Sequence, residues 1–275
     1  MIDQPGLRLA TAPAEPEPDL ERRFDGLRRL YGDAGYGRLR ALRVAVVGLG
    51  GVGSWSVEAL ARSGVAELTL IDLDHVAESN INRQVQALGA TLGQSKAEAL
   101  RERIADIHPG CKVHAVEEFV DESNWPALLP QPVDAVIDAC DQVRAKAAMA
   151  AWAAASGTLL VMVGAAGGKH RAQAVELGDL SEVTHDPLLA SLRQRLRKQH
   201  GARREGKMGL RCVFSREAVV APADNCDVDG SLNCHGYGSS VAVTATFGMV
   251  AASAVIDVWT KQTPRPLKGA EKTTL

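Results

Sequence analysis

Short apolar runs alternate with longer mixed stretches along the middle of this 275-residue chain. The apolar runs lie at 44–47, 68–71, 133–138 and 158–163. They lack the strict alternation of half-exposed strands and are typical of strands buried on both faces. Helices are predicted between them, at about 52–62, 95–107 and 142–155, with further strands at 112–116 and 211–215 and a helix from about residue 187. This order predicts an α/β fold: a mostly parallel sheet with helices on both faces.

Composition changes at both ends of this alternating region. The first residues are rich in proline and poor in apolar residues, which is typical of disorder. The next segment combines apolar and arginine residues around a glycine-rich turn at 32–37, which predicts one or two short helices. We therefore expect a disordered lead-in at 1–19, a helical N-terminal arm at 20–42, a nucleotide-binding core at 43–168, a C-terminal strand and loop portion at 169–262 and a flexible tail at 263–275.

The first predicted strand runs into the glycine-rich loop Gly48-Leu49-Gly50-Gly51-Val52-Gly53, and the second strand ends in Asp72. Strand, glycine loop, helix, strand and acid form a dinucleotide-binding fingerprint in its expected context. Glycines let the backbone approach a phosphate, and a carboxylate at the end of the second strand can accept hydrogen bonds from ribose. We expect a Rossmann-like site built from Gly48, Gly50, Gly51, Gly53 and Asp72; the alternative is a turn that only packs helix on strand.

Polar residues after Asp72 change which nucleotide is expected. Asn80, Arg83 and Gln84 follow it, and Lys96 lies at the start of the next helix. Cations here can balance the charge that develops on a departing pyrophosphate, whereas hydride transfer has no such requirement. The sequence has no G-x-x-x-x-G-K-[ST] loop. The pattern favours ATP over NAD, with surface ion pairs as the alternative role for Arg83 and Lys96.

A second carboxylate is expected at the same edge of the sheet. Asp141 closely follows the strand that ends at Asp138, and the carboxyl ends of parallel strands meet where ligands bind. Gly164–Gly168 follows the next strand and should converge there too. A carboxylate at this edge can hold Mg²⁺ on phosphates. It can also cap the helix that begins at Gln142, and the two roles are compatible.

Composition narrows the class of protein. A net charge of −2 demands neither nucleic acid nor a membrane, although local clusters can still bind either. The five cysteines contain no C-x-x-C pair, which argues against structural zinc and for a reduced, cytoplasmic setting. The apolar run 241–259 is near the length of a membrane span. Its small residues and Asp257 favour a buried or dimer-interface helix over membrane association.

Several separated motifs agree in order and spacing. They are the glycine loop, Asp72-Leu73-Asp74, Ser79-Asn80-Ile81-Asn82-Arg83-Gln84, Gly93-Gln94-Ser95-Lys96 and Cys140-Asp141. Together they resemble the ubiquitin-activating-enzyme superfamily, which includes bacterial adenylyltransferases of molybdopterin and thiamin biosynthesis. The resemblance covers about residues 20–165. It implies that a substrate carboxylate attacks the α-phosphate of ATP, giving an acyl-adenylate and pyrophosphate.

The resemblance also implies residue roles. Asp72 would bind ribose, Asn80, Arg83 and Lys96 would contact phosphates, Asp74 and Gln84 would belong to the same nucleotide site, and Asp141 would serve Mg²⁺ or the adenylate. Arg23, in the pair Arg23-Phe24, resembles an arm arginine that reaches into the site of a partner subunit, which implies a homodimer. Arg22 is a close rival for this role.

Further motifs narrow the resemblance. Arg22–Leu27, Leu30–Gly32, Thr184–Leu188 and Thr244–Gly248 are similar to the tRNA threonylcarbamoyladenosine dehydratase branch. This branch implies ATP-dependent cyclisation of the threonylcarbamoyl group on the tRNA adenosine beside the anticodon. The carboxylate is adenylated, an internal nucleophile closes the ring, and AMP leaves. The alternative is an adenylyltransferase that activates the C-terminal glycine of a sulfur-carrier protein, but such members usually carry two C-x-x-C zinc pairs, which are absent here.

A tRNA substrate needs phosphate-binding cations outside the nucleotide crevice, and the segment 193–211 supplies them. They are Arg193, Arg195, Arg197, Lys198, Arg203, Arg204 and Lys207. A solvated basic helix face is the alternative. Aromatic residues are few, so recognition should depend on backbone charge and shape, with Tyr237 as one candidate for base stacking.

Two other interpretations remain open at this point. A nucleotide-binding scaffold could work in a sulfur-transfer relay with a cysteine desulfurase partner, using Cys234 in a polar loop. Intact Arg83, Lys96 and Asp141 argue against a scaffold without activity. Cys212 lies in a predicted strand and is expected to be structural. An NAD-dependent dehydrogenase has support only from the glycines.

Overall fold

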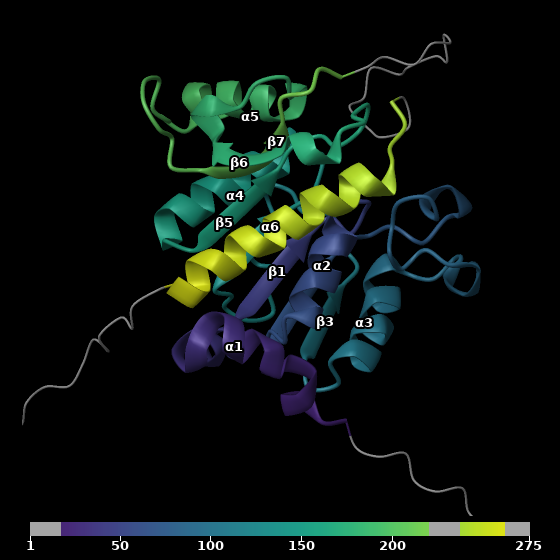
Figure 1. The fold of residues 1–275 in the computed structure, drawn as a ribbon. Coiled ribbons are helices and arrows are strands. Elements are labelled where there is room, and N and C mark those ends of the chain that lie inside the picture. The colour runs from purple at the N-terminus through teal and green to yellow at the C-terminus, as the bar shows by residue number, and fades with distance from the viewer. Residues whose placement is uncertain (1–17, 220–236, 262–275) are drawn as a thin grey trace, which may run out of the picture.

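A computed structural model describes residues 18–219 and 237–261 (Figure 1). Its seven-stranded sheet has the order β3-β2-β1-β4-β5-β7-β6, and only β6 and β7 pair antiparallel. The strands are β1 (Arg43–Val47), β2 (Glu67–Ile71), β3 (Lys112–Val116), β4 (Ala135–Asp138), β5 (Leu159–Val163), β6 (Val175–Asp179) and β7 (Arg211–Ser215). The helices are α1 (Leu20–Leu39), α2 (Gly53–Arg62), α3 (Lys96–Ile107), α4 (Val143–Ser156), α5 (Pro187–Gln199) and α6 (Val241–Lys261). The expected α/β fold is confirmed.

Successive residues of each strand face two different layers of helices. Val44 and Val46 of β1 belong to a core shared with α1, α2, α3 and α6. Ala45 and Val47 belong to the opposite core, shared with α4 and α5. In Figure 1, α6 crosses the first of these faces beside α2. Because both faces are covered, the central strands are apolar at nearly every position.

Most element boundaries follow the sequence pattern, and β3 and β7 fall on the expected residues. The edge strand β6, Val175–Asp179, is not predicted by that pattern. Its sequence Val-Glu-Leu-Gly-Asp contains glycine and two acids, which are poor strand formers. It forms because one side of β7 is available for antiparallel pairing. The expected lead-in and tail, apart from residues 18 and 19, lie outside the described residues.

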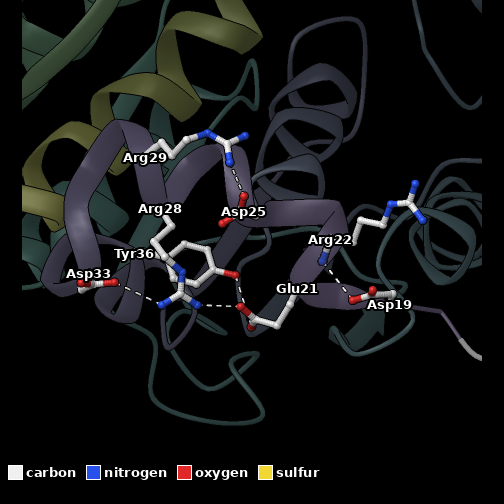
Figure 2. Close-up of polar contacts among 8 residues, drawn as sticks. All are labelled: Asp19, Glu21, Arg22, Asp25, Arg28, Arg29, Asp33 and Tyr36. Carbon is white, nitrogen blue, oxygen red and sulfur yellow. Dashed lines mark hydrogen bonds and ion pairs between the residues drawn. The ribbon is translucent and has the colours of Figure 1, made fainter.

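The N-terminal arm is the bent helix α1. Gly32 has φ of +67°, and the chain is kinked there, as expected for two short helices joined by a glycine turn. Arg28 ties the two halves together, because it donates to Glu21 at 2.6 Å and to Asp33 at 3.1 Å (Figure 2). Its guanidinium also lies over the ring of Tyr36 at 4.5 Å. Such exposed ion pairs add little stability, so their main effect is to fix the angle of the kink.

The apolar run at 241–259 forms most of α6. This helix is long and apolar enough to cross a membrane, with mean hydropathy 1.8, yet half of that apolar window is buried inside the protein. Gly248 permits close packing on α2, because a Cβ there would lie 2.5 Å from the carbonyl oxygen of Val52. The hydroxyl of Ser56 donates to the carbonyl oxygen of Gly248 at 3.1 Å. This packing fits the expected buried or dimer-interface helix.

Candidate active site

The glycine loop between β1 and α2 packs directly on the turn between β4 and α4. Gly48 has φ of +84°, and a Cβ there would lie 2.8 Å from the carbonyl oxygen of Ala139. A Cβ on Gly53 would lie only 1.8 Å from the carbonyl oxygen of Gly48. A side chain at Gly48 would separate the two turns, and one at Gly53 would clash within the glycine loop itself. Backbone atoms therefore form this wall of the crevice.

Asp72 holds the glycine loop from the end of β2. Its carboxylate accepts hydrogen bonds from the backbone N–H of Leu49 at 2.6 Å and of Asp74 at 2.8 Å. Burial raises the pKa of Asp72, and the charge of Lys96 and the two backbone donors offset this only in part. A carboxylate has about four acceptor positions, so lone pairs remain for a ribose hydroxyl.

A cavity of about 620 Å³ opens at the carboxyl ends of the strands. Its volume lies in the range of small-molecule sites. Most of the expected nucleotide residues line it, namely Gly48, Gly50, Gly51, Asp72, Asp74, Asn80, Arg83, Gln84, Lys96 and Asp141. Gly53 lies beneath the loop in the first turn of α2, where it permits close packing. The segments that are distant in sequence therefore meet, as the topology predicts.

Two cations are held in fixed positions along the cavity. Lys96 is buried at the start of α3, and its Nζ lies 2.7 Å from a carboxylate oxygen of Asp74. The aliphatic part of Arg83 lies over Gly51, where a Cβ would approach its Cγ to 3.2 Å. The Arg83 guanidinium donates to the carbonyl oxygen of Ser79 at 2.6 Å. Both charges are therefore oriented before a ligand binds.

Buried amides support this segment. Asn80 accepts a hydrogen bond from the backbone N–H of Ala77 at 3.0 Å. Gln86 donates to the carbonyl oxygen of Leu49 at 3.0 Å and to the side chain of Gln84 at 3.2 Å. Gln86 thus joins the 80–86 segment to the glycine loop. The sequence pattern gives it no role, because a glutamine without a motif carries no local signal.

Asp141 is an exposed carboxylate at the wall of the cavity. The alternative role, a cap on α4, is wrong: the N-cap residue is Gln142, and no side chain caps that end. Among the described residues, no group of three or more histidine, cysteine, aspartate or glutamate side chains could hold a metal ion. A single carboxylate is nevertheless enough for Mg²⁺ when phosphates and water supply the other ligands.

The basic segment divides into inward and outward cations. Arg193 donates to the carbonyl oxygens of Leu180 at 3.0 Å and of Val183 at 2.8 Å, so its expected contact with tRNA is corrected to a structural one. Arg195 is paired with Glu122 at 2.6 Å. Arg197 donates to backbone carbonyls of the following loop. Lys198, Arg203, Arg204 and Lys207 are exposed, and Lys207 Nζ lies 3.9 Å from a carboxylate oxygen of Glu182.

The exposed loop and the cavity lie at opposite ends of α5. Pro187 and Leu188, at its start, line the cavity, whereas the basic loop follows its last turn. A helix of 13 residues spans roughly 20 Å. Any ligand that contacts both regions of one chain must therefore be large, as a folded RNA is.

The arm arginines lie away from the cavity of their own chain. Arg23 donates to the carbonyl oxygens of Asp106 at 2.6 Å and Ile107 at 2.7 Å, at the end of α3 opposite Lys96. The backbone N–H of Arg22 donates to Asp19, and Figure 2 shows its guanidinium directed away from the other drawn side chains. Neither lines the cavity.

The described cysteines have no features of nucleophiles. Cys140 lines the cavity, but burial, followed by the nearby Asp138 carboxylate, raises the pKa of its thiol well above the ordinary value. Cys212 is buried in β7, and burial raises its pKa as well. The expected structural role of Cys212 is consistent with this position. Cys234, proposed as a reactive thiol, lies outside the described residues.

Three further residues line the cavity that the sequence did not place at the nucleotide site. Phe119, in the loop after β3, is 52% exposed at the cavity. Thr244 reaches it from the first turn of α6, and Tyr237 from the segment just before that helix. Phe119 has no local signal. Thr244 and Tyr237 come from a part of the chain remote in sequence, so only the packing of α6 places them.

Comparison with known proteins agrees with this geometry. The ThiF family model matches residues 24–273. A tRNA threonylcarbamoyladenosine dehydratase of Haemophilus influenzae is 40% identical over 242 residues, covering 86% of this chain and 93% of the relative. That of Escherichia coli is 41% identical over 244 residues, covering 84% and 91%. The crystal structure of the E. coli tRNA N6-threonylcarbamoyladenosine dehydratase with ATP has a TM-score of 0.79 at 41% identity, covering 87% and 94%, and a complex with AMP is also known. The chain belongs to the ThiF family.

Proposed function

We propose that this protein is an ATP-dependent dehydratase acting on threonylcarbamoyladenosine in tRNA, next to the anticodon. It adenylates the carboxylate of the modified nucleoside and cyclises it, with release of pyrophosphate and AMP. The observation that carries the proposal is the convergence of Arg83, Lys96 and Asp141 around a nucleotide cavity. The relatives that match most of the chain bear the same activity in their names, and one of them binds ATP.

The cavity divides naturally between adenosine and phosphates. The glycine loop and Asp72 would hold the adenosine part, as in other crevices of this topology. Asn80, Arg83 and Lys96 would face the phosphates. Attack of the carboxylate on the α-phosphate forms one P–O bond and breaks the bond to pyrophosphate. Fixed cations stabilise this step because they need no reorientation as charge develops on the leaving group.

The second half of the reaction closes a ring. A nucleophile of the threonylcarbamoyl group attacks the activated carbonyl carbon, and AMP leaves with one former carboxylate oxygen. The net change is loss of one water, with ATP converted to AMP and pyrophosphate. No thiol is required for this step. The raised pKa of Cys140 fits a reaction in which that sulfur stays protonated.

Mg²⁺ is the expected metal, and Asp141 is the residue that would hold it. Its carboxylate is exposed at the cavity wall, where phosphate oxygens and water can complete the coordination. Bound there, Mg²⁺ would offset charge on the phosphates.

The tRNA backbone would contact the outward cations Lys198, Arg203, Arg204 and Lys207. Arg195 and Arg197 are supporting residues, because each already contacts protein groups. The anticodon region must reach the cavity while the rest of the tRNA extends along α5. The enzyme is expected to be cytoplasmic, where ATP and tRNA meet.

A homodimer would bring Arg23 of one subunit to the cavity of the other. Its present partners are carbonyl oxygens at the C-terminal end of α3, and an exposed arginine can exchange these partners for phosphate. Arg22 is the alternative residue for this role. A sulfur-transfer partner such as a cysteine desulfurase is a further prediction, and Cys234, on which it would depend, is not among the described residues.

The direct test is incubation of the protein with ATP and threonylcarbamoylated tRNA, followed by mass analysis of the nucleosides. We expect the modified nucleoside to lose one water while AMP and pyrophosphate accumulate in equal amounts. AMP formation that requires a small carrier protein instead of tRNA would contradict the proposal and support activation of a C-terminal glycine.

A further inference from the structure

A charged lysine is completely buried beneath the cavity. Lys146, in the first turns of α4, is 0% exposed. Its Nζ lies 3.1 Å from a carboxylate oxygen of Asp138, and it donates to the carbonyl oxygens of Val163 at 2.8 Å and Asp138 at 3.3 Å. Asp138 and Val163 are the last residues of β4 and β5. Lys146 therefore ties the ends of two adjacent strands together at the edge that carries the cavity.

Asp138 also holds the turn between β4 and α4 that follows it. The same carboxylate oxygen that faces Lys146 accepts hydrogen bonds from the backbone N–H of Cys140 at 3.2 Å and from its thiol at 3.0 Å. Burial disfavours the ammonium form of Lys146, but the Asp138 carboxylate and the other nearby groups together outweigh it, and the pKa of Lys146 is raised. One carboxylate oxygen of Asp138 thus contacts both Lys146 and the turn.

The other side of the turn is fixed by the glycine loop. The backbone N–H of Ala139 donates to the carbonyl oxygen of Val47 at 2.8 Å, and Gly48 approaches Ala139 so closely that a Cβ would not fit between them. The turn is thus held between the glycine loop and Lys146. Asp141 is the next residue along, and it enters the cavity wall directly from this clamped segment.

Stability alone is a poor reason for such a pair. Replacing a buried ion pair by neutral groups of similar volume is often neutral or stabilising, because the two charges lose their hydration. We propose that Lys146 is a positioning residue for adenylation: through Asp138 it fixes the turn between β4 and α4, and thereby the place of Asp141 in the cavity. This inference rests on the role proposed above for Asp141.

The test uses a double variant that removes both charges, Lys146→Met with Asp138→Asn. A single variant would leave an uncompensated buried charge and could fail to fold. Asn keeps an acceptor for the Cys140 N–H, so the change isolates the link through Lys146. We expect the double variant to unfold near the wild-type midpoint, with kcat for AMP release about 100-fold lower and the KM for ATP within about threefold of wild type. A wild-type kcat would overturn the proposal.

Coupling to Asp141 distinguishes positioning from a general structural effect. If Lys146 acts through Asp141, then in an Asp141→Asn background the double change should cost less than about threefold in kcat, far below its effect in the wild-type background. A full additional loss in that background would show that Lys146 acts by another route and would overturn the proposal.

An ion pair at the other end of β4 provides the matched control. Arg43 and Asp134 are paired at 2.9 Å before the strands β1 and β4 enter the core. The double variant Arg43→Met with Asp134→Asn should keep the wild-type kcat. An equal loss of kcat in this control would show that both effects come from a general disturbance of β4 and not from the turn between β4 and α4. That result would overturn the proposal.

ATP binding gives a readout that needs no turnover. In calorimetry, Mg²⁺ should tighten ATP binding to the wild type by about threefold and leave binding to the Lys146→Met/Asp138→Asn variant unchanged, with equal affinities in the absence of Mg²⁺. An equal increase in affinity in both proteins would overturn the positioning role. If the wild type failed to convert the tRNA, the proposed function would be wrong, but this binding difference would still decide the role of Lys146.

Discussion

The cavity and the basic segment both present cations, but they hold them in different ways. In the cavity, Lys96 is buried and paired with Asp74, and Arg83 is fixed by a carbonyl oxygen. In the basic segment, Arg203 and Arg204 are exposed in the loop between α5 and β7. Fixed cations suit one transition-state geometry. Exposed cations suit a polyanion, whose affinity depends on the number of counterions released.

Loss of a cavity cation should have the largest effect. We expect Arg83→Ala and Lys96→Met each to lower the rate of adenylation about 10²–10³-fold, because a preoriented charge on the phosphates is removed. Pyrophosphate release in single-turnover experiments measures this step. Arg43→Met, outside the cavity, should lose at most about 1 kcal/mol of stability with an unchanged rate. An unchanged rate of adenylation in both cavity variants would contradict the proposed contact of Arg83 and Lys96 with the phosphates.

The arm arginine tests whether the cavity is complete within one chain. Arg23→Ala should lower kcat about 100-fold if a second subunit supplies this charge. Mixing inactive Arg23→Ala and Lys96→Met proteins should then restore activity, since some mixed dimers contain one intact site. Mixed samples that stay inactive would contradict sharing between subunits. Comparing the activity of Arg22→Ala with that of Arg23→Ala identifies which arginine acts, because only loss of the acting arginine should lower kcat.

The outward cations should change affinity and leave the chemistry intact. We expect Arg203→Ala/Arg204→Ala to weaken tRNA binding about tenfold and to reduce the slope of log K against log salt by about 2, one for each phosphate that is no longer neutralised. Arg193→Met is the matched control, because this arginine of the same segment bonds inward to carbonyl oxygens. It should lose stability and keep the slope. An unchanged slope in the double variant would exclude this loop from the tRNA surface.

A pH effect on folding stability lies in neither region. His108 is buried beside Arg40, and burial followed by the Arg40 charge lowers its pKa from 6.5 to about 4. Because the pKa of this histidine is lower in the folded than in the unfolded protein, its contribution to stability is complete above the unfolded pKa and is lost as the pH falls toward the folded pKa. Stability should therefore fall between pH 6.5 and pH 4, by up to about 3 kcal/mol. Denaturant unfolding of wild type and His108→Gln measures it, and an equal pH dependence in both proteins would contradict this assignment.

Local motifs made much of the cavity predictable. The glycine loop and Asp72 lie within a single strand–helix–strand unit, so sequence spacing determines their geometry. The position of Asp141 was equally predictable, because the carboxyl ends of parallel strands lie at one edge of the sheet. The structure explains the spacing of Arg83 and Lys96 in the same way, since both belong to segments that return to that edge.

Tertiary packing accounts for what the sequence pattern did not show. Arg193 looked like its neighbours in a basic run, but its position on α5 directs it toward the carbonyl oxygens of Leu180 and Val183. Thr244 reaches the cavity only because α6 packs across the sheet. Edge strand β6 has a weak sequence pattern and depends on β7 for pairing. The charges and the hydrophobic periodicity of a local segment do not by themselves determine these long-range interactions.

The central claim is that a substrate carboxylate attacks the α-phosphate of ATP in this cavity. Threonylcarbamoylated tRNA labelled with ¹⁸O in the threonine carboxylate tests it directly, with the products analysed by mass spectrometry. Because AMP leaves with a former carboxylate oxygen, we predict one ¹⁸O in AMP, none in pyrophosphate and one in the cyclised nucleoside. Label in inorganic phosphate together with ADP would show attack on the γ-phosphate and would contradict the account.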